Sequence, residues 1–312
     1  MDGESRNPVV TARDLTDIEA EFVADPFLIW WKGVWYLFFE AFRRDSRLGE
    51  IGLAVSSDLL SWEYQKIVLR ESFHLSYPYV FEWEGSCYMI PESLGANEVR
   101  LYKSRDFPFE WQLHCSLIPG HQADPSIFRH ADRWWMFACD TPYAHRSLRL
   151  YSAPHLEGPW EEHPESPIVE HDASVARPAG RVIDFDGRLL RFAQDCSKQY
   201  GGQVWAFEIT RLSRRRYGER LASAKPVIGG GSEGQWRTSR MHHLDAHVLS
   251  TGDWFACVDG WPLQEARSQG GTLNAEPRRF GEFEEKSEDA SPTLKAAKQD
   301  ASHTTLNRLF PH

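Results

Sequence analysis

The sequence predicts an all-β fold, a five-bladed β-propeller whose blades are four-stranded antiparallel sheets. A hairpin pattern of aromatic and β-branched residues recurs five times, and its copies begin at residues 25, 77, 124, 177 and 243. The copies are spaced by about 50 residues, which is the length of one propeller blade. Three copies continue with an alternating apolar stretch and a tryptophan that opens another strand, so that four strands are expected for each blade.

The composition fits this fold and excludes several classes of protein. The chain has 312 residues, enough for one large β domain with a core, and 13% of them are aromatic. A net charge of −10 argues against nucleic acid as a partner, because a phosphate backbone needs a basic face. No apolar run is long enough for a membrane span, and the N-terminus does not resemble a signal peptide. The five cysteines read as free thiols, which predicts a cytoplasmic location.

The first repeat shows the blade pattern most clearly. An Asp-Pro pair opens the hairpin at residue 25, a Lys-Gly pair turns it, and Glu40 ends it. Alternating apolar residues at 49–56 predict a third strand, and Trp62 begins a short outer strand. Residues 1–22 have no strong period and could supply a closing strand or a loop.

The second and third repeats follow the same order. The second hairpin runs from Tyr77 to Glu92, and the third runs from Asp124 to Asp140. Each is followed by an alternating apolar stretch and then by a tryptophan, as in the first repeat. We therefore expect three complete blades in the first half of the chain.

The last two repeats are less regular. The fourth hairpin runs from Arg177 to Asp195, and a weaker fifth hairpin runs from His243 to Asp259. The pattern stops after Trp261, so the last blade looks incomplete. We place the propeller at residues 1–262.

Residues 263–312 differ in composition from the rest of the chain. They are rich in Glu, Lys, Ser, Ala and Gly and contain few aromatic residues. Such a segment lacks the apolar surface that a packed core needs. We predict a low-complexity, disordered C-terminal tail, in which a short helix at 294–298 could form.

The ends of the five hairpins are the expected functional region. In a propeller the innermost strand of each blade starts near the central funnel and the second strand returns to the same face. The first and last residues of every hairpin should therefore surround one mouth, and every hairpin ends in a carboxylate. The first residues are Asp25, Tyr77, Asp124, Arg177 and His243, and the last residues are Glu40, Glu92, Asp140, Asp195 and Asp259.

Convergent carboxylates are what the cleavage of a glycosidic bond needs. One acid protonates the leaving oxygen, and another carboxylate acts as base or nucleophile. Crowded like charges raise one pKa, which produces a usable acid. Arg177 would keep a neighbouring carboxylate ionised or bind a polar group of the ligand. The aromatic rings of Tyr77, Tyr79 and Trp236 could stack on sugar faces.

Each of these residues also has a structural interpretation. An Asp-Pro pair at a strand start is often simply a turn, and a repeat could copy that turn. Glu40, Asp140 and Asp195 could cap the turns that lead to the third strands. Glu92 follows an apolar strand, where a buried carboxylate without a partner is costly, and this favours a functional role.

The fifth repeat contains a pattern that could bind a metal ion. His243, Asp245 and His247 alternate, so a strand would place them on one face, where a cation at the propeller axis could bind. Histidines in such positions are more often hydrogen-bonded polar residues. We therefore expect no cofactor, with these three residues as weak metal candidates.

Several motifs together resemble a known family. They are Ala24-Asp25-Pro26-Phe27, Phe73–Phe81, Met89–Ser93, Ala176–Gly180, Gln194-Asp195 and Met241-His242-His243. The Asp-Pro-led repeats look like the five-bladed propellers of the arabinanase, levansucrase and invertase superfamily, which is glycoside hydrolase family 43-like. Within it, residues 8–261 resemble the propeller domain that lies N-terminal to the glycosyltransferase of glucosamine inositolphosphorylceramide transferases, and its free-standing bacterial relatives.

The resemblance implies catalytic roles and one departure from them. It implies that Asp25 is the base or nucleophile and that Asp124 orients groups and tunes a pKa. The superfamily's general acid is a glutamate that opens a later hairpin, but the matching position here is Arg177. We choose Glu92 as the substitute acid, since it should reach the same mouth. The residues expected to bind the substrate are Tyr77, Arg177, Asp195, His243, Glu40 and Asp140.

Three functions remain as alternatives. The first is a glycoside hydrolase or transglycosidase that acts at a carboxylate-lined funnel. The second is a carbohydrate-binding propeller that has lost the usual acid and does not catalyse a reaction. The third is a scaffold whose funnel is merely solvated. In the first two, the partner is a carbohydrate or glycoconjugate ligand.

Overall fold

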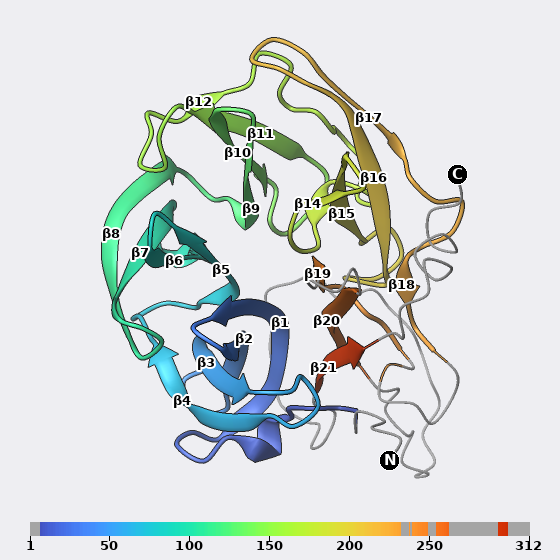
Figure 1. The fold of residues 1–312 in the computed structure, drawn as a ribbon. Helices are drawn as coiled ribbons and strands as arrows, with labels where there is room; N and C mark the ends of the chain where they lie inside the picture. Colours follow the sequence, from blue (N-terminus) through green and yellow to red (C-terminus); the bar gives the residue numbers. More distant parts are fainter. Residues whose placement is uncertain (1–6, 232–236, 238, 249–253, 262–292, 299–312) are drawn as a thin grey trace.

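The computed structural model describes residues 7–231, 237, 239–248, 254–261 and 293–298, the last range as backbone only. Five antiparallel sheets stand in a ring around a central axis, as Figure 1 shows. The helical elements in this part of the chain are two 3-10 turns, η1 (Ala12–Asp14) and η2 (Leu94–Ala96). The predicted all-β, five-bladed propeller is therefore confirmed. Over the same residues, no helix has the length and apolar character that crossing a membrane requires.

The first three blades are four-stranded sheets in simple sequence order, as predicted. Blade one consists of β1 (Ala20–Trp31), β2 (Val34–Arg43), β3 (Gly49–Ser56) and β4 (Glu63–Leu69). Blade two consists of β5 (Ser76–Trp83), β6 (Ser86–Glu92), β7 (Glu98–Asp106) and β8 (Glu110–Pro119). Blade three consists of β9 (Ala123–His130), β10 (Arg133–Cys139), β11 (Leu148–Ala153) and β12 (Glu161–Glu162).

Tight turns with a glycine join the two inner strands of the first two blades. Lys32 and Gly33 have φ values of 48° and 90°, and Glu84 and Gly85 have φ values of 49° and 75°. Positive φ at both central residues is the geometry of a type I′ turn, whose twist matches that of the flanking strands. Glycine adopts this conformation without steric cost, which explains why the sequence pattern marked these hairpins reliably.

The inner strand of the fourth blade is interrupted. This blade consists of β13 (Arg177–Pro178), β14 (Ile183–Phe185), β15 (Arg188–Asp195), β16 (Gln203–Leu212), β17 (Tyr217–Leu221) and β18 (Ile228–Gly229). Between β13 and β14 the chain passes through Gly180 (φ 131°), where an added Cβ would lie 2.0 Å from the carbonyl oxygen of Leu244. The N–H group of Leu244 donates to the Ala179 carbonyl at 2.9 Å. This close approach, which only glycine permits, joins blade four to blade five.

Within the described residues, the fifth blade consists of the strands β19 (Leu244–Val248), β20 (Trp254–Gly260) and β21 (Thr293–Lys298). The helix predicted at 294–298 is wrong, because these residues pair with β20 as a strand. A helix of five residues is marginal by itself, whereas the edge of an incomplete blade offers unpaired main-chain groups. The rest of the expected tail lies outside the described residues, so its disorder and the domain boundary at 262 stay predictions.

Separate hydrophobic cores fill the spaces between adjacent blades. The largest of those described joins blades one, two and three and includes Phe27, Phe38 and Tyr102. Other clusters join blade three to blade four and blade four to blade five. The N-terminal segment packs Val10 and Leu15 into the cluster between blades one and five, so it helps to close the ring through apolar contacts.

Candidate functional site at the mouth of the propeller

Three hairpins begin with the same backbone conformation. Asp25, Tyr77 and Asp124 each precede a proline and have φ values of 51°, 48° and 50°. Each lies at a shift in register between the first two strands of its blade. A residue before proline normally avoids this region, so the surrounding contacts must hold it there. We call the end of the ring where these three residues lie the mouth.

Buried carboxylates at the mouth connect three pairs of neighbouring blades. Asp259 of blade five accepts a hydrogen bond from the N–H group of Asp25 at 3.2 Å. Asp25 of blade one accepts one from the N–H group of Tyr77 at 3.3 Å. Glu92 of blade two accepts one from the N–H group of Asp124 at 3.1 Å. The strained residues are therefore fixed by acidic side chains of the preceding blade.

Arg177 of blade four holds two of these carboxylates together. Its Nε atom donates to Asp124 Oδ2 at 2.6 Å, and its Nη2 atom lies 3.2 Å from Glu92 Oε2. Its Nη1 atom donates to the carbonyl oxygen of Pro142 at 2.9 Å. Gln194 Nε2 also donates to Asp124 Oδ2, at 2.8 Å. The arrangement agrees with the prediction that Arg177 would face a neighbouring carboxylate.

Two carboxyl groups of the mouth have strongly raised proton affinity. Burial raises the pKa of Asp25 to about 7, and the cation of His242 opposes this shift. Burial likewise raises the pKa of Asp124 to about 7, where Arg177 opposes the shift and Glu92 adds to it. Groups with such pKa values can give or take a proton near neutral pH.

Glu40 adds a further acidic group to the mouth. It is buried, and its Oε1 atom lies 3.4 Å from His74 Nε2. Burial raises the pKa of Glu40 well above its usual range, and the charges of Asp25 and Glu92 add to this. Glu40 therefore belongs electrostatically to the same cluster as the other carboxylates.

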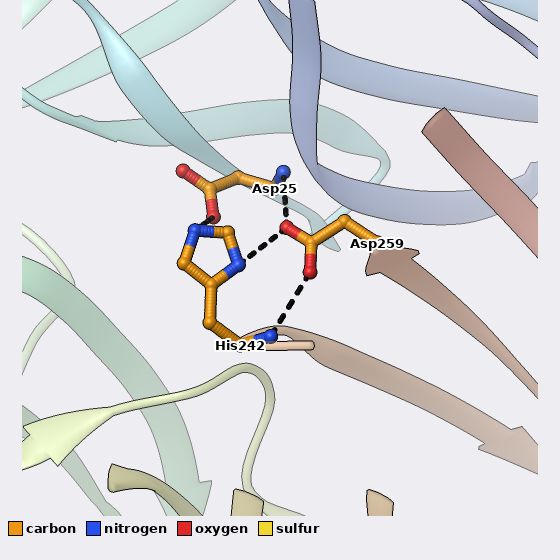
Figure 2. Close-up of side chains that lie close together, drawn as sticks. All are labelled: Asp25, His242 and Asp259. Carbon is orange, nitrogen blue, oxygen red and sulfur yellow. Dashed lines mark hydrogen bonds and ion pairs between the residues drawn. The ribbon is translucent and has the colours of Figure 1, made fainter. Parts of the chain in front are cut away.

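A cluster of Asp25, His242 and Asp259, shown in Figure 2, lies where blade five meets blade one. His242 Nδ1 lies 2.6 Å from Asp259 Oδ2, and His242 Nε2 lies 3.8 Å from Asp25 Oδ1. Burial disfavours the imidazolium, but Asp259 and Asp25 hold the pKa of His242 above its usual value. The two aspartates therefore favour the charged form of the His242 ring.

This group is also the one among the described residues that could hold a metal ion. The ligand atoms of Asp25, His242 and Asp259 lie within 4.8 Å of one another. A cation could enter only by displacing the short ion pair between His242 and Asp259. We therefore interpret the group as a hydrogen-bonded cluster.

Two of the three residues proposed from the sequence as metal candidates, Asp245 and His247, contact each other, and His243 does not join them. Asp245 accepts hydrogen bonds from Leu28 N at 2.7 Å and from Arg181 Nε at 2.9 Å, and it lies 2.8 Å from His247 Nε2. His243 is fully buried, and burial lowers its pKa to about 4, so its ring is neutral. An arginine at the Asp245 carboxylate occupies the place that a cation would need.

Asp140 and Asp195, which were expected at the mouth, have other partners. Asp140 forms an ion pair with Arg149 at 2.6 Å. Asp195 accepts hydrogen bonds from the N–H group of Ser197 at 3.0 Å and from Gln203 Nε2 at 2.8 Å. These contacts agree with the alternative interpretation, in which the two aspartates stabilise the connections to the third strands.

Tyr77, proposed to bind a substrate, lies entirely inside the structure. Its side chain has no exposed surface. Its hydroxyl group lies 2.7 Å from Ser126 Oγ and accepts a hydrogen bond from Gly180 N at 2.7 Å. It therefore ties blades two, three and four together below the mouth. Trp236, the other proposed aromatic platform, lies outside the described residues.

Tyr77→Phe is expected to lower the free energy of unfolding by about 1–3 kcal/mol, because buried polar groups of Ser126 and Gly180 lose their partner. Urea unfolding followed by tryptophan fluorescence measures this. Tyr143→Phe is the matched control, since Tyr143 is 77% exposed and its hydroxyl loss should change stability by less than ~0.5 kcal/mol. Equal stability of the two variants would contradict the cross-blade role of Tyr77.

Sequence reasoning did not single out several residues of the site. Gln194 pairs with Arg177 across the fourth hairpin, so counting the register from Arg177 would have favoured Gln194 over Asp195. His242 stands one residue before the expected start of the fifth hairpin, and its role depends on the neighbouring blade. Tyr200 comes from a connection without a repeat pattern, and its ring centroid lies 5.1 Å from the Arg177 guanidinium.

Comparison with known sequences identifies the family. The family described as "Glucosamine inositolphosphorylceramide transferase 1, N-terminal" matches residues 4–261. The chain belongs to this family. A relative from Oryza sativa subsp. indica, named glucosamine inositolphosphorylceramide transferase 1, is 38% identical over 264 residues, and one of the same name from Arabidopsis thaliana is 33% identical over 262 residues. Both alignments cover 81% of this chain but only 35% and 34% of the relatives, so the chain spans about a third of their length.

Solved structures that match this chain support the fold described above. The catalytic domain of the Coprinopsis cinerea GH62 α-L-arabinofuranosidase matches with a TM-score of 0.64 at 12% identity, over 90% of this chain and 92% of that chain. A sucrose-6-phosphate hydrolase from Lactobacillus gasseri matches with a TM-score of 0.58 at 12% identity, over 84% of this chain and 58% of that chain. At such identities the likeness establishes the fold alone. The resemblance stated from the sequence is confirmed for both family and fold.

Proposed function

We propose that the mouth binds a sugar-containing ligand and acts on its glycosidic bond. The observation that carries this proposal is the presence of two buried carboxyl groups, Asp25 and Asp124, whose pKa values are about 7. Acid–base chemistry at a glycosidic bond uses carboxyl groups that can be protonated near neutral pH. Burying such groups costs stability, which a purely structural mouth would avoid with apolar residues.

In the proposed reaction, Asp25 is the base or nucleophile and Glu92 is the acid. The Oδ1 atom of Asp25 faces the imidazole rings of His242 and His243 at 3.8 and 3.9 Å, respectively. Glu92 forms an ion pair with Arg177, so the bound ligand must displace the guanidinium, and Glu92 must take up a proton from solvent before it can protonate the leaving oxygen. Asp124 would then act as a positioning residue, because it shares the guanidinium group with Glu92.

The charge of the mouth restricts the chemistry of the ligand. Its buried carboxyl groups outnumber its buried cations: the acids are Asp25, Glu40, Glu92, Asp124 and Asp259, and the cations are Arg177 and His242. Carboxyl groups accept hydrogen bonds from the hydroxyl and ammonium groups of a ligand. The name of these relatives includes glucosamine, a sugar that carries both hydroxyl and ammonium donors. We propose a neutral or amino sugar as the bound group.

The test is a turnover assay on a panel of neutral and amino glycosides. Asp25→Asn and Glu92→Gln should each lose most of the activity of the wild-type chain. Glu63→Gln is the control, because Glu63 is exposed on the outer strand β4, and it should keep full activity. If both mouth variants release product at the wild-type rate, this assignment of roles is refuted.

Carbohydrate binding without catalysis is the second candidate function. It is favoured by the donors that already occupy the carboxylates: Asp124 accepts from Arg177 and Gln194, and Glu92 accepts from Arg177 and the N–H group of Asp124. Isothermal titration with the same sugars separates the two functions. Binding that survives both substitutions, with no product released, would favour a binding domain.

The cysteines bear on the cellular location of this activity. Cys87, Cys115, Cys139 and Cys196 are free thiols. Free, mostly buried thiols fit a reducing compartment. We include a cytoplasmic location in the proposal on this ground.

A further inference from the structure

A cavity lies at the end of the inner strands opposite the mouth. It has a volume of about 510 Å³ and is formed by the C-terminal ends of β5 and β9 and by the β14–β15 hairpin. The mouth lies at the N-terminal ends of the same strands, about 20 Å away for six extended residues. We propose that this cavity is a binding site for a neutral saccharide.

The wall of the cavity is aromatic and firmly held. Phe81, Trp83, Phe128 and Trp134 line it. The rings of Trp83 and Trp134 meet edge to face at 5.0 Å, and those of Phe81 and Trp134 lie 5.8 Å apart. The guanidinium of Arg129 lies 4.9 Å from the Trp83 ring centroid. Phe81, Phe128 and Trp134 are buried, so Trp83, which is half-buried, is the ring that these contacts hold at the cavity for the C–H groups of a sugar.

Charged side chains stand among these rings and are held in place by the main chain. Glu82 and Asp184 line the cavity, and each accepts one N–H group of its own turn, at 2.6 and 3.0 Å. Arg129 donates to the carbonyl oxygen of Ala131 at 3.0 Å. Fixed polar groups beside aromatic and apolar side chains are the features that orient a ligand in a small-molecule site.

The charged residues that line the cavity favour a neutral ligand. Arg181 lines the cavity, but Asp245 neutralises it at 2.9 Å. The lining also contains Arg129 and two carboxylates, those of Glu82 and Asp184, so the cavity has no excess of positive charge for a phosphate. Hydroxyl groups can donate to the carboxylates and accept from the guanidinium. A neutral polyhydroxylated ring satisfies both the wall and the charged groups.

The volume agrees with this assignment. Small-ligand pockets measure about 300–1,000 Å³, and this cavity lies in that range, large enough for a mono- or disaccharide. None of the carboxylates proposed for catalysis lines it. The inference is therefore independent of the reaction proposed at the mouth, and either one can fail without the other.

The experiment is a fluorine NMR titration of the full chain labelled with 5-fluorotryptophan. The probes are glucose, galactose, mannose, arabinose, xylose and cellobiose, with inorganic phosphate as the anionic probe. A sugar is expected to shift the Trp83 resonance, which Trp83→Phe identifies. Trp83→Ala should weaken this binding about tenfold, and Trp83→Phe should retain most of it. Trp30→Ala is the matched control, since Trp30 is 49% exposed on another hairpin, and it should bind as wild type does.

Other outcomes would overturn the proposal. They are the absence of any sugar-induced shift at Trp83, an affinity that Trp83→Ala leaves unchanged, and saturable binding of phosphate in place of sugar. If Trp83→Ala does not fold, as its melting curve would show, Arg129→Gln replaces it, because Arg129 is exposed. That variant should weaken sugar binding several-fold, and wild-type affinity would refute the site.

Discussion

Asp25→Asn is expected to abolish turnover at the mouth and, at the same time, to stabilise the fold above neutral pH. Asparagine keeps the size of the side chain, and its amide oxygen can still accept the hydrogen bond from Tyr77 N. It can neither exchange a proton nor act as a nucleophile. Loss of such a group typically lowers a rate by about 10²–10⁴-fold, which is the effect expected here.

The gain in stability follows from the raised pKa of Asp25. Burial raises this pKa from 3.8 to about 7, so the folded chain holds a proton that the unfolded chain releases at lower pH. The contribution of this group to stability is fully present below about pH 4 and is lost as the pH rises through about 7. Because a tenfold change in proton affinity corresponds to ~1.4 kcal/mol, Asp25→Asn should gain on the order of 2–4 kcal/mol at about pH 8. Near pH 4 the gain should vanish.

Asp259 provides a control of opposite sign beside Asp25. Burial acts to raise its pKa, but the ion pair with His242 outweighs burial and holds the pKa below its usual value. Asp259 therefore stabilises the fold above its unfolded pKa, and this contribution is lost as the pH falls. Asp259→Asn should destabilise the chain at about pH 8, as urea unfolding across this pH range would show. If Asp25→Asn were destabilising there as well, the protonation assigned to Asp25 would be incorrect.

The blades could be predicted because their information is local. The hairpins at Asp25 and Tyr77 repeat an opening pair, an apolar alternation and a glycine turn, and each of these has a short-range physical cause. Their convergence at one mouth then follows from propeller geometry. Repeat spacing alone was therefore enough to predict one shared mouth for Asp25, Glu92, Asp124 and Arg177.

The remaining features depend on register and on neighbouring blades. A shift of one residue in the strand-pairing register decides whether Gln194 or Asp195 faces the mouth, because successive side chains of a strand point to opposite faces. Tyr77 points into the structure because it lies in a bulge with positive φ. The amino-acid composition of the strand does not predict that conformation. The residues at 293–298 form a strand because β20 offers an open edge, which a local pattern cannot show.

Arg177→Met is expected to lower the free energy of unfolding by about 3–5 kcal/mol at neutral or higher pH. The guanidinium lies between Asp124 and Glu92, and all three side chains are buried. Methionine fills much of the same volume but leaves two buried carboxylates without their cation. Arg177 also opposes the rise in the pKa of Asp124, so this pKa should increase further in the variant.

The pH dependence of Arg177→Met separates a charge effect from a loss of packing. Protonated carboxyl groups need no cation, so the destabilisation should shrink as the pH falls toward about 5. Arg149→Met is the matched control, because Arg149 also lies 2.6 Å from an aspartate, Asp140, but with its side chain 29% exposed. That variant should cost less than about 1 kcal/mol, since solvent screens exposed pairs. Equal costs for the two variants, or a cost for Arg177→Met that does not change with pH, would mean that the mouth is not held by buried charge.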